Sequence, residues 1–254
     1  MMKITILTLF PEMFLGILDN SIIKRAIAKG SAKVELVNIR DFTKNKYGRV
    51  DTPPIGGGAG LVMQVQPIVD ALRSIEGGYK VLLSPRGEKF NQAKAHSFSQ
   101  KDHIILICGH YEGVDERVNE YVDELVSIGD YILTGGEIGA MAITDAIIRL
   151  LPDVIASDSL LEESFTSGLL EYPQYTEPFV FENKKVPLIL YSGNHEAIKK
   201  WRLKQSLKIT QNHRPDLFNK HHLTKKEKSL LEEGDNPKWE EDAIKKGNKF
   251  TDKD

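Results

Sequence analysis

The chain has 254 residues, of which 41% are hydrophobic and 28% are charged, and its formal net charge is −2. This composition is typical of a folded globular protein, and it excludes a collagen-like chain, a coiled coil and a mainly disordered chain. A single cysteine, Cys108, excludes an internal disulfide and a zinc site made of several thiolates. The apolar start is interrupted by Pro11, Glu12 and Asp19, so we expect no signal peptide, no membrane span and a cytoplasmic protein.

Short β-rich runs alternate with helical stretches through the first 151 residues. Helices are predicted over 67–76, 91–100 and 137–151, and the last of these is apolar nearly all round. Such a helix belongs in an interior or at an interface. Strands, each bounded by Gly, Pro, Asp or Asn, are predicted over 3–9, 33–39, 79–84, 103–108 and 125–127. Strands separated by helices imply an α/β domain with a mostly parallel sheet.

The remaining chain changes character twice. Residues 156–178 are rich in Ser, Thr and Gly, which is typical of a flexible linker or loop. Helices are then predicted over 194–208, with Asn194 as N-cap, and over 224–233. We therefore expect a domain over 1–155, an interdomain linker over 156–178, and a small, mostly α-helical and basic domain over 179–254.

The net charge near zero is an average over opposed parts. Residues 184–228 hold 12 Lys and Arg against 3 Asp and Glu, a net charge of +9, whereas residues 1–183 have a net charge of −8. The basic segment is typical either of a nucleic-acid-binding surface or of a solvated lysine-rich helix face. The net charge of −2 therefore does not exclude an RNA partner.

Four glycine-bearing segments are candidates for ligand binding. The loop 55–60 lacks the Lys-Ser/Thr of a phosphate-binding loop and follows no predicted strand, so by itself it is weak evidence. The segments 83–87, 108–113 and 128–136 each lie at the C-terminal end of a predicted strand, the edge at which open α/β sheets bind ligands. They are either a pocket for an adenosine-like ligand or three ordinary turns. Cys108 is more consistent with a packed core thiol than with a nucleophile.

At these residues the sequence resembles the bacterial tRNA (guanine-N1)-methyltransferases of the knotted SPOUT superfamily. The resemblance covers almost the whole chain in order. Its matching stretches are Leu9-Phe10-Pro11-Glu12-Met13-Phe14, Arg40-Asp41-Phe42-Thr43, Gly56–Gly60, Leu83–Gly87, Cys108–Arg117, Ser127–Glu137, Gly168–Thr176 and Ser192–Leu207.

The resemblance implies a fold and a reaction that periodicity does not reveal. The parallel sheet would carry a deep trefoil knot, an exception to the rule against knotted connections, and two copies would form a homodimer with active sites between subunits. The enzyme would transfer a methyl group from S-adenosyl-L-methionine (SAM) to N1 of tRNA guanosine-37, 3′ of the anticodon, and Mg²⁺ is expected although no ligand set is visible. The expected SAM-binding residues are Leu83, Ser84, Pro85, Gly109, Tyr111, Ile128, Gly129, Asp130, Tyr131, Ile132, Leu133, Gly135 and Gly136.

The resemblance also implies three catalytic residues. A base must accept the N1 proton of guanine as the methyl group moves, and Glu163 occupies the position where the family has an Asp. Arg149 matches an Arg that stabilises negative charge on guanine O6, and Glu112 matches an acidic residue that helps to hold the purine. The added methylene of Glu163 displaces its carboxylate by about 1 Å, and Asp158 is an alternative compensating group.

Two other functions remain open at this point. A non-catalytic SAM- and RNA-binding protein is consistent with Glu163 and with Glu177, which replaces an Arg expected to face tRNA. An α/β enzyme acting on a small nucleotide is consistent with a basic segment that is merely solvated.

Overall fold

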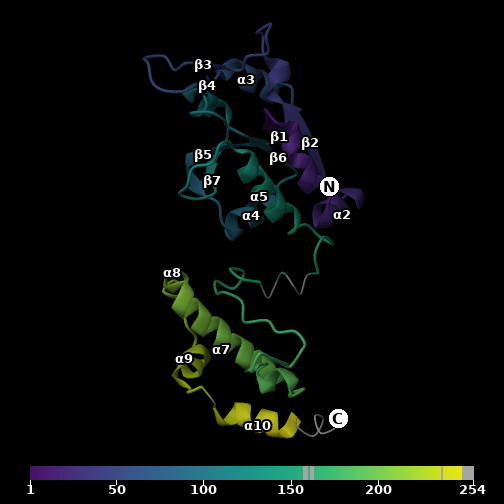
Figure 1. Cartoon of the computed structure of the whole chain (residues 1–254), viewed down its shortest axis with the longest axis vertical. Helices are drawn as coiled ribbons and strands as arrows, with labels where there is room; N and C mark the ends of the chain where they lie inside the picture. The colour runs from purple at the N-terminus through teal and green to yellow at the C-terminus, as the bar shows by residue number, and fades with distance from the viewer. Residues whose placement is uncertain (157–159, 161–162, 236, 248–254) are drawn as a thin grey trace. The chain divides into compact units, whose positions relative to one another are not determined.

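The computed structural model describes residues 1–156, 160, 163–235 and 237–247. The chain divides into two compact units, residues 1–157 and 158–254 (Figure 1). Within the described ranges, no helix is long and apolar enough to cross a membrane.

A five-stranded, fully parallel sheet forms the centre of the first unit, with strand order β2-β1-β6-β5-β7. Its members are Met2–Thr8 (β1), Ala32–Asn38 (β2), Tyr79–Lys89 (β5), His103–Ile107 (β6) and Glu124–Ser127 (β7). The predicted α/β class and parallel sheet are confirmed. A short antiparallel pair, Asp51–Thr52 (β3) with Val62–Met63 (β4), lies outside this sheet.

Side chains alternate between the two faces of the sheet and enter two separate cores. Ile4 and Ile6 of β1 pack into one core, whereas Leu7 packs into the other. Both faces of the central strands are thus buried, which explains their nearly continuous apolar runs.

Helices cover both faces of the sheet. Residues of α2 (Ser21–Ala28), α4 (Gln92–Ser99) and α5 (Glu137–Ile148) fill the first core, and residues of α3 (Val65–Arg73) fill the second. Figure 1 shows α4 and α5 side by side and α3 near β3 and β4. The shorter elements are α1 (Leu15–Leu18) and the 3-10 turns Pro11–Phe14, Ile39–Phe42 and Glu116–Tyr121.

The apolar α5 is an interior helix for most of its length, as its composition predicts. Ala140, Ile143, Ile147 and Ile148 are fully buried, whereas Ile138 is exposed. Helix α2 was not expected from the sequence, because a helix of eight residues is marginal by itself and is stabilised here by packing.

Strand β5 departs from the prediction. It was expected to end at Ser84, but it continues to Lys89 with a register shift in which Leu83 and Glu88 both align with Val126 of β7. The segment 83–87 therefore bulges out within a strand and does not follow its end. A Cβ atom on Gly87 would lie 2.3 Å from the Val126 amide nitrogen, so only glycine lets the backbone return to β7 this closely.

The second unit is mostly helical. The predicted N-cap is confirmed, since Asn194 Oδ1 accepts a hydrogen bond from the Ala197 amide, and Thr224 and Glu227 form a capping box. Its small core contains Ile189, Trp201 and Ala243. The elements are α7 (His195–His213), α8 (Pro215–Phe218), α9 (Lys225–Glu232), α10 (Lys238–Gly247), the 3-10 turn Leu188–Tyr191, and the antiparallel pair Val180–Phe181 (β8) and Lys184–Lys185 (β9).

One row of lysines on α7 is engaged by the acidic segment after α9. Lys200 pairs with Glu233 at 3.2 Å and Lys208 pairs with Asp235 at 2.7 Å. Between them, the buried Lys204 donates to the Gly234 carbonyl at 2.6 Å, and its burial lowers the pKa of its ammonium group. Part of the +9 charge of residues 184–228 is thus balanced within the unit.

Gly87→Ala is expected to destabilise the first unit by at least about 2 kcal/mol, because the new methyl group overlaps the β7 backbone and neither strand can yield cheaply. Urea unfolding followed by circular dichroism measures the loss. Gly16→Ala is the matched control, since no atom lies within 4 Å of its Cβ position. Equal stability of the two variants would contradict the close approach.

The pairing of β1 with β2 carries an acid-sensitive contact. Glu35 lies 2.9 Å from Lys3 and 2.6 Å from Lys33, and hydrogen bonds from these lysines lower its pKa to about 2. Its stabilisation is therefore present above the ordinary pKa of 4.5 and is lost as the pH falls toward 2. Since the groups are about a third exposed, we expect at most about 1 kcal/mol. The difference in Tm between the wild type and Glu35→Gln should shrink as the pH falls from 4.5 toward 2. A constant difference would contradict the lowered pKa of Glu35.

Candidate active site

The loops that follow β6 and β7 meet at the carboxyl edge of the sheet. The Gly136 amide donates a 2.8 Å hydrogen bond to the Gly109 carbonyl, and His110 forms a bridge with Gly135. A Cβ atom on Gly136 would lie 2.9 Å from Cys108 Cα, so the two loops touch backbone to backbone. The third loop, 83–87, comes from β5 between them, and the Gly109 Cβ position lies 3.7 Å from the Leu83 carbonyl. The structure thus brings together the three segments singled out in the sequence.

These loops combine buried backbone with exposed apolar side chains. Ile132 is 82% exposed and Tyr131 is 57% exposed, which is unusual for large hydrophobic residues of a folded protein. Leu83, Ser84 and Ile128 are half-buried, and the side chains of Leu83 and Ile128 lie against Gly139 of α5. Backbone amides and carbonyls beside apolar side chains are the donor set that suits an adenosine-like ligand.

The buried carboxylate of Glu137 contacts residues beside these loops. Glu137, the first residue of α5, is 2% exposed, and its Oε1 accepts a 2.9 Å hydrogen bond from Thr8 Oγ1 at the end of β1. Its Oε2 lies 3.8 Å from His110 Nδ1. One side chain thereby links the end of β1 and the loop after β6 to the start of α5. Glu137 was not among the site residues expected from the sequence, although a lone carboxylate opening an apolar helix after Gly-Gly was the available signal.

Tyr111 has a specific polar environment. Its backbone is left-handed, with φ 59°, and its hydroxyl lies near the side chains of Asp51 and Arg40. Burial and then Asp51 raise the pKa of Tyr111. The motif residue Arg40 thus lies beside the loop 108–113, a position that the sequence did not reveal.

Glu112 lies against the glycine-rich loop. A Cβ atom on Gly60 would lie 2.5 Å from Glu112 Oε1, and Gly60 has φ +74°, so Gly60 lies directly against this carboxylate. The Glu112 amide donates to the Leu61 carbonyl at 3.0 Å. The loop and the candidate purine-binding residue therefore form one structural element.

Four other candidates have defined positions. Arg149 is the C-cap residue of α5, and Asp130 forms an ion pair with Lys89 of β5. Pro85 is exposed, and Cys108 is fully buried with its thiol pKa raised by burial, as expected for a core thiol.

Glu163 belongs to the second unit. It lines a cavity of about 200 Å³ together with Tyr172, Lys199 and Arg202. Glu163 lies beside α7 in the second unit, whereas Arg149 and Glu112 belong to the first unit. Asp158 and Glu162 lie outside the described residues.

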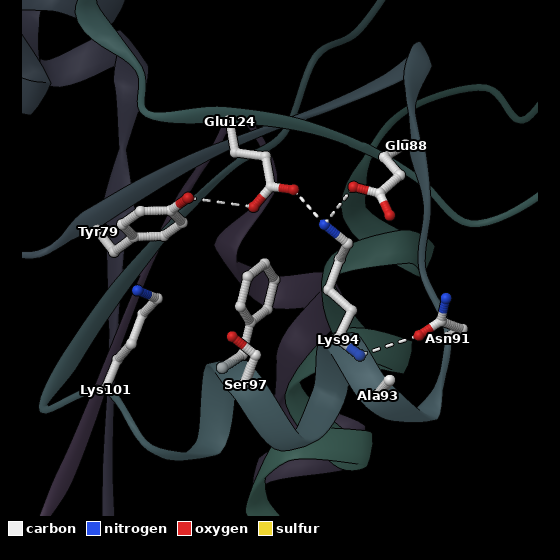
Figure 2. Close-up of a pocket in the computed structure, with 9 residues that line it drawn as sticks. Tyr79, Glu88, Asn91, Ala93, Lys94, Ser97, Lys101 and Glu124 are labelled. Atoms are coloured by element: carbon white, nitrogen blue, oxygen red, sulfur yellow. Dashed lines mark hydrogen bonds and ion pairs between the residues drawn. The ribbon is translucent and has the colours of Figure 1, made fainter. Parts of the chain in front are cut away.

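A second cavity, of about 260 Å³, lies at the amino-terminal ends of β5 and β7. Figure 2 shows Lys94 between Glu88 and Glu124, with the Tyr79 hydroxyl donating to Glu124. Its charged groups are engaged with one another, which marks a structural network that ties α4 to the sheet.

The described residues contain no group of three or more His, Cys, Asp or Glu side chains that could hold a metal ion. The histidines therefore form no metal centre within these ranges, and we assign no residue to Mg²⁺.

A parallel sheet whose carboxyl edge carries glycine-rich loops, a buried carboxylate and exposed apolar side chains is the architecture of α/β enzymes that bind a nucleoside-containing cofactor. A family model described as tRNA (guanine-1)-methyltransferase TrmD matches residues 2–220. The chain belongs to this family.

Curated relatives carry the same description. A tRNA (guanine-N(1)-)-methyltransferase of Dictyoglomus turgidum is 55% identical over 236 residues, which cover 92% of this chain and 96% of the relative. Those of Clostridium novyi and Geobacillus kaustophilus are 53% and 50% identical, over 91% and 95% of this chain and 97% and 99% of the relatives.

Thr8→Val is expected to lower the free energy of unfolding by roughly 2 kcal/mol, because it leaves the buried Glu137 oxygen and the Phe10 amide without the Thr8 hydroxyl. Urea unfolding of the full chain measures the change. Thr52→Val, at an exposed position, is the control and should be nearly neutral. A neutral Thr8→Val would contradict a supporting role for the Thr8–Glu137 contact.

Proposed function

We propose that the protein transfers the methyl group of SAM to N1 of guanosine-37, the nucleotide 3′ of the anticodon in tRNA. The observation that carries this proposal is the family match over residues 2–220, which includes the three loops, Arg149 and Glu163. The convergence of the loops supports it independently.

SAM supplies an electrophilic methyl group on a sulfonium, a good leaving group, so the protein has to position the two reactants and accept a proton. The loops 83–87, 108–113 and 128–136 would hold the adenosine through backbone groups and apolar contacts. Their exposed Tyr131, Ile132 and Leu133 support this assignment. Asp130 would act through its ion pair with Lys89, which fixes the position of the loop.

Glu163 is the proposed general base. N1 of neutral guanine carries a proton and is a poor nucleophile, so a carboxylate within hydrogen-bond reach is needed as the methyl group moves. The segment that carries Glu163 is anchored, since the Glu171 amide donates to Ser164 Oγ at 3.0 Å and the Leu170 amide donates to Thr210 Oγ1 of α7 at 2.8 Å. Such anchoring supports a positioned base in place of the family's Asp.

Arg149 and Glu112 complete the proposed catalytic set. As N1 is deprotonated, negative charge spreads to guanine O6, and the Arg149 guanidinium would stabilise it. Glu112, which lies against Gly60, would accept hydrogen bonds from the purine.

Residues 184–228 are proposed to bind the RNA backbone. Because Lys200, Lys204 and Lys208 are engaged by residues 233–235, phosphate contacts fall to other basic residues of this segment. Among these, the pair Lys184 and Lys185 is exposed. Binding through phosphates weakens steeply with salt.

We also propose the trefoil knot and the homodimer that the family implies. The backbone contact between Gly109 and Gly136 is consistent with threaded loops. Exposed Ile132 and Ile138 offer apolar area for a second copy of the chain. The family also implies Mg²⁺, for which we propose no ligand residue.

Single-turnover methyl transfer from labelled SAM to tRNA tests the reaction. Product should form on tRNA with guanosine at position 37 and not on tRNA with adenosine there. Binding without product would favour the non-catalytic SAM- and RNA-binding protein. Turnover of a free nucleotide by a chain lacking residues 184–254 would favour an enzyme that acts on a small nucleotide.

Glu163→Ala should slow transfer by roughly 100-fold or more, whereas Glu232→Ala, which removes an exposed carboxylate of the same unit, should not. Near-normal transfer by Glu163→Ala would refute the assignment of the base.

A further inference from the structure

Three lysines form a row along one face of α7. Lys200, Lys204 and Lys208 are spaced four residues apart, so they follow one another along the same side of the helix. Such a row of ammonium groups attracts any polyanion, because cations that meet phosphates bind nucleic acid whatever its sequence. If this lysine row were uncovered, it would bind unrelated RNA as well as the substrate.

The acidic segment 233–235 neutralises both ends of the lysine row. Lys200 Nζ lies 3.2 Å from Glu233 Oε1, and Lys208 Nζ lies 2.7 Å from Asp235 Oδ1. The side chains of Lys200 and Lys208 are 29% and 32% exposed. Both ammonium groups would therefore be open to an RNA phosphate if the two carboxylates did not pair with them.

Further contacts hold the acidic segment against α7. Lys204 is buried and donates to the Gly234 carbonyl at 2.6 Å. Trp239 of α10 donates from Nε1 to Glu233 Oε2 at 2.7 Å, and the Lys200 ammonium lies 4.2 Å from the centroid of the Trp239 ring. The segment is therefore fixed on the helix at its centre and at Glu233.

Stability by itself does not account for the ion pair at Asp235. This side chain is 91% exposed, and ion pairs at such positions contribute little to the free energy of unfolding. Its larger effect is to cancel a cation on the unit that is proposed to meet RNA. The family match ends at residue 220, so it assigns no role to the acidic segment.

We propose that Glu233 and Asp235 are specificity determinants, which suppress binding of unrelated RNA by cancelling the charge at the two ends of the lysine row. The proposal rests on the function proposed above, because it presupposes an RNA substrate. Affinity for unrelated RNA comes almost entirely from cations that meet phosphates, whereas a substrate also makes contacts that depend on its shape and its bases. Cancelling these cations therefore lowers the affinity for unrelated RNA while the other contacts of the substrate remain.

The test is binding of a fluorescently labelled oligouridine, which lacks the target guanosine, to the full chain at a series of salt concentrations. Asp235→Asn and the double variant Glu233→Gln/Asp235→Asn should both bind it more tightly than the wild type. The slope of log affinity against log salt should become steeper by about 0.7 for each lysine that meets a phosphate of single-stranded RNA. The affinity for tRNA with guanosine at position 37 should change less, so the preference for the substrate should fall.

A double-mutant cycle separates the proposed pairing from a general change in net charge. In the Lys208→Gln background, Asp235→Asn should no longer raise the affinity for oligouridine, because the cation that it releases is absent. Glu232→Gln is the matched control, since it removes an exposed carboxylate at the end of α9, and it should leave the slope nearly unchanged. Circular dichroism identifies any variant that fails to fold, and the exposed position of Asp235 keeps the test available if Glu233→Gln does so.

Three results would overturn the proposal. These are an unchanged slope in folded Asp235→Asn, which would make the pair purely structural, a gain that persists in the Lys208→Gln background, or an equal gain for oligouridine and tRNA.

Methyl transfer distinguishes this failure from failure of the proposed function. A wild type that methylates tRNA while Asp235→Asn leaves the slope unchanged overturns the role of the acidic segment alone. A wild type that forms no product, although Asp235→Asn raises the affinity for oligouridine as expected, overturns the proposed function alone.

Discussion

The close approach of backbone to backbone at the carboxyl edge of the sheet is the constraint on which the first unit depends. The Gly136 amide reaches the Gly109 carbonyl at 2.8 Å, and Gly87 passes β7 with no room for a methyl group. Each contact removes polar backbone groups from water while pairing them, which is the condition for burying such groups at all. The three loops can lie this close together only because these glycines let their backbones touch.

Glu137 is the electrostatic counterpart of this geometry. A carboxylate that is 2% exposed is costly to bury unless its oxygens are satisfied, and Thr8 together with the first turn of α5 reduces that cost. Because its partners lie at the ends of different strands, the same group couples the positions of the loops. A packing defect at one of these loops would therefore change the positions of the others.

The second unit uses charge differently. Its α7 presents one lysine row to the acidic segment 233–235, while Lys199 and Arg202 line the cavity beside Glu163. The net charge counts both sets of basic residues alike, although the lysine row is already paired with groups of the protein itself. The engaged lysine row holds the second unit together, so the phosphate contacts proposed for residues 184–228 fall to other basic residues.

The sequence alone determined the class of the fold and the position of the glycine-rich segments that follow β6 and β7, because alternating short strands and helices with glycines after the strands have local signatures. It also determined Asn194 as a cap and Cys108 as a core thiol. Only the tertiary structure revealed Glu137, the Arg40–Asp51–Tyr111 cluster and the return of β5 at Gly87, because each depends on partners that are distant in sequence. It likewise revealed which lysines are neutralised, since a net charge of +9 in residues 184–228 carries no information about which acidic groups lie opposite.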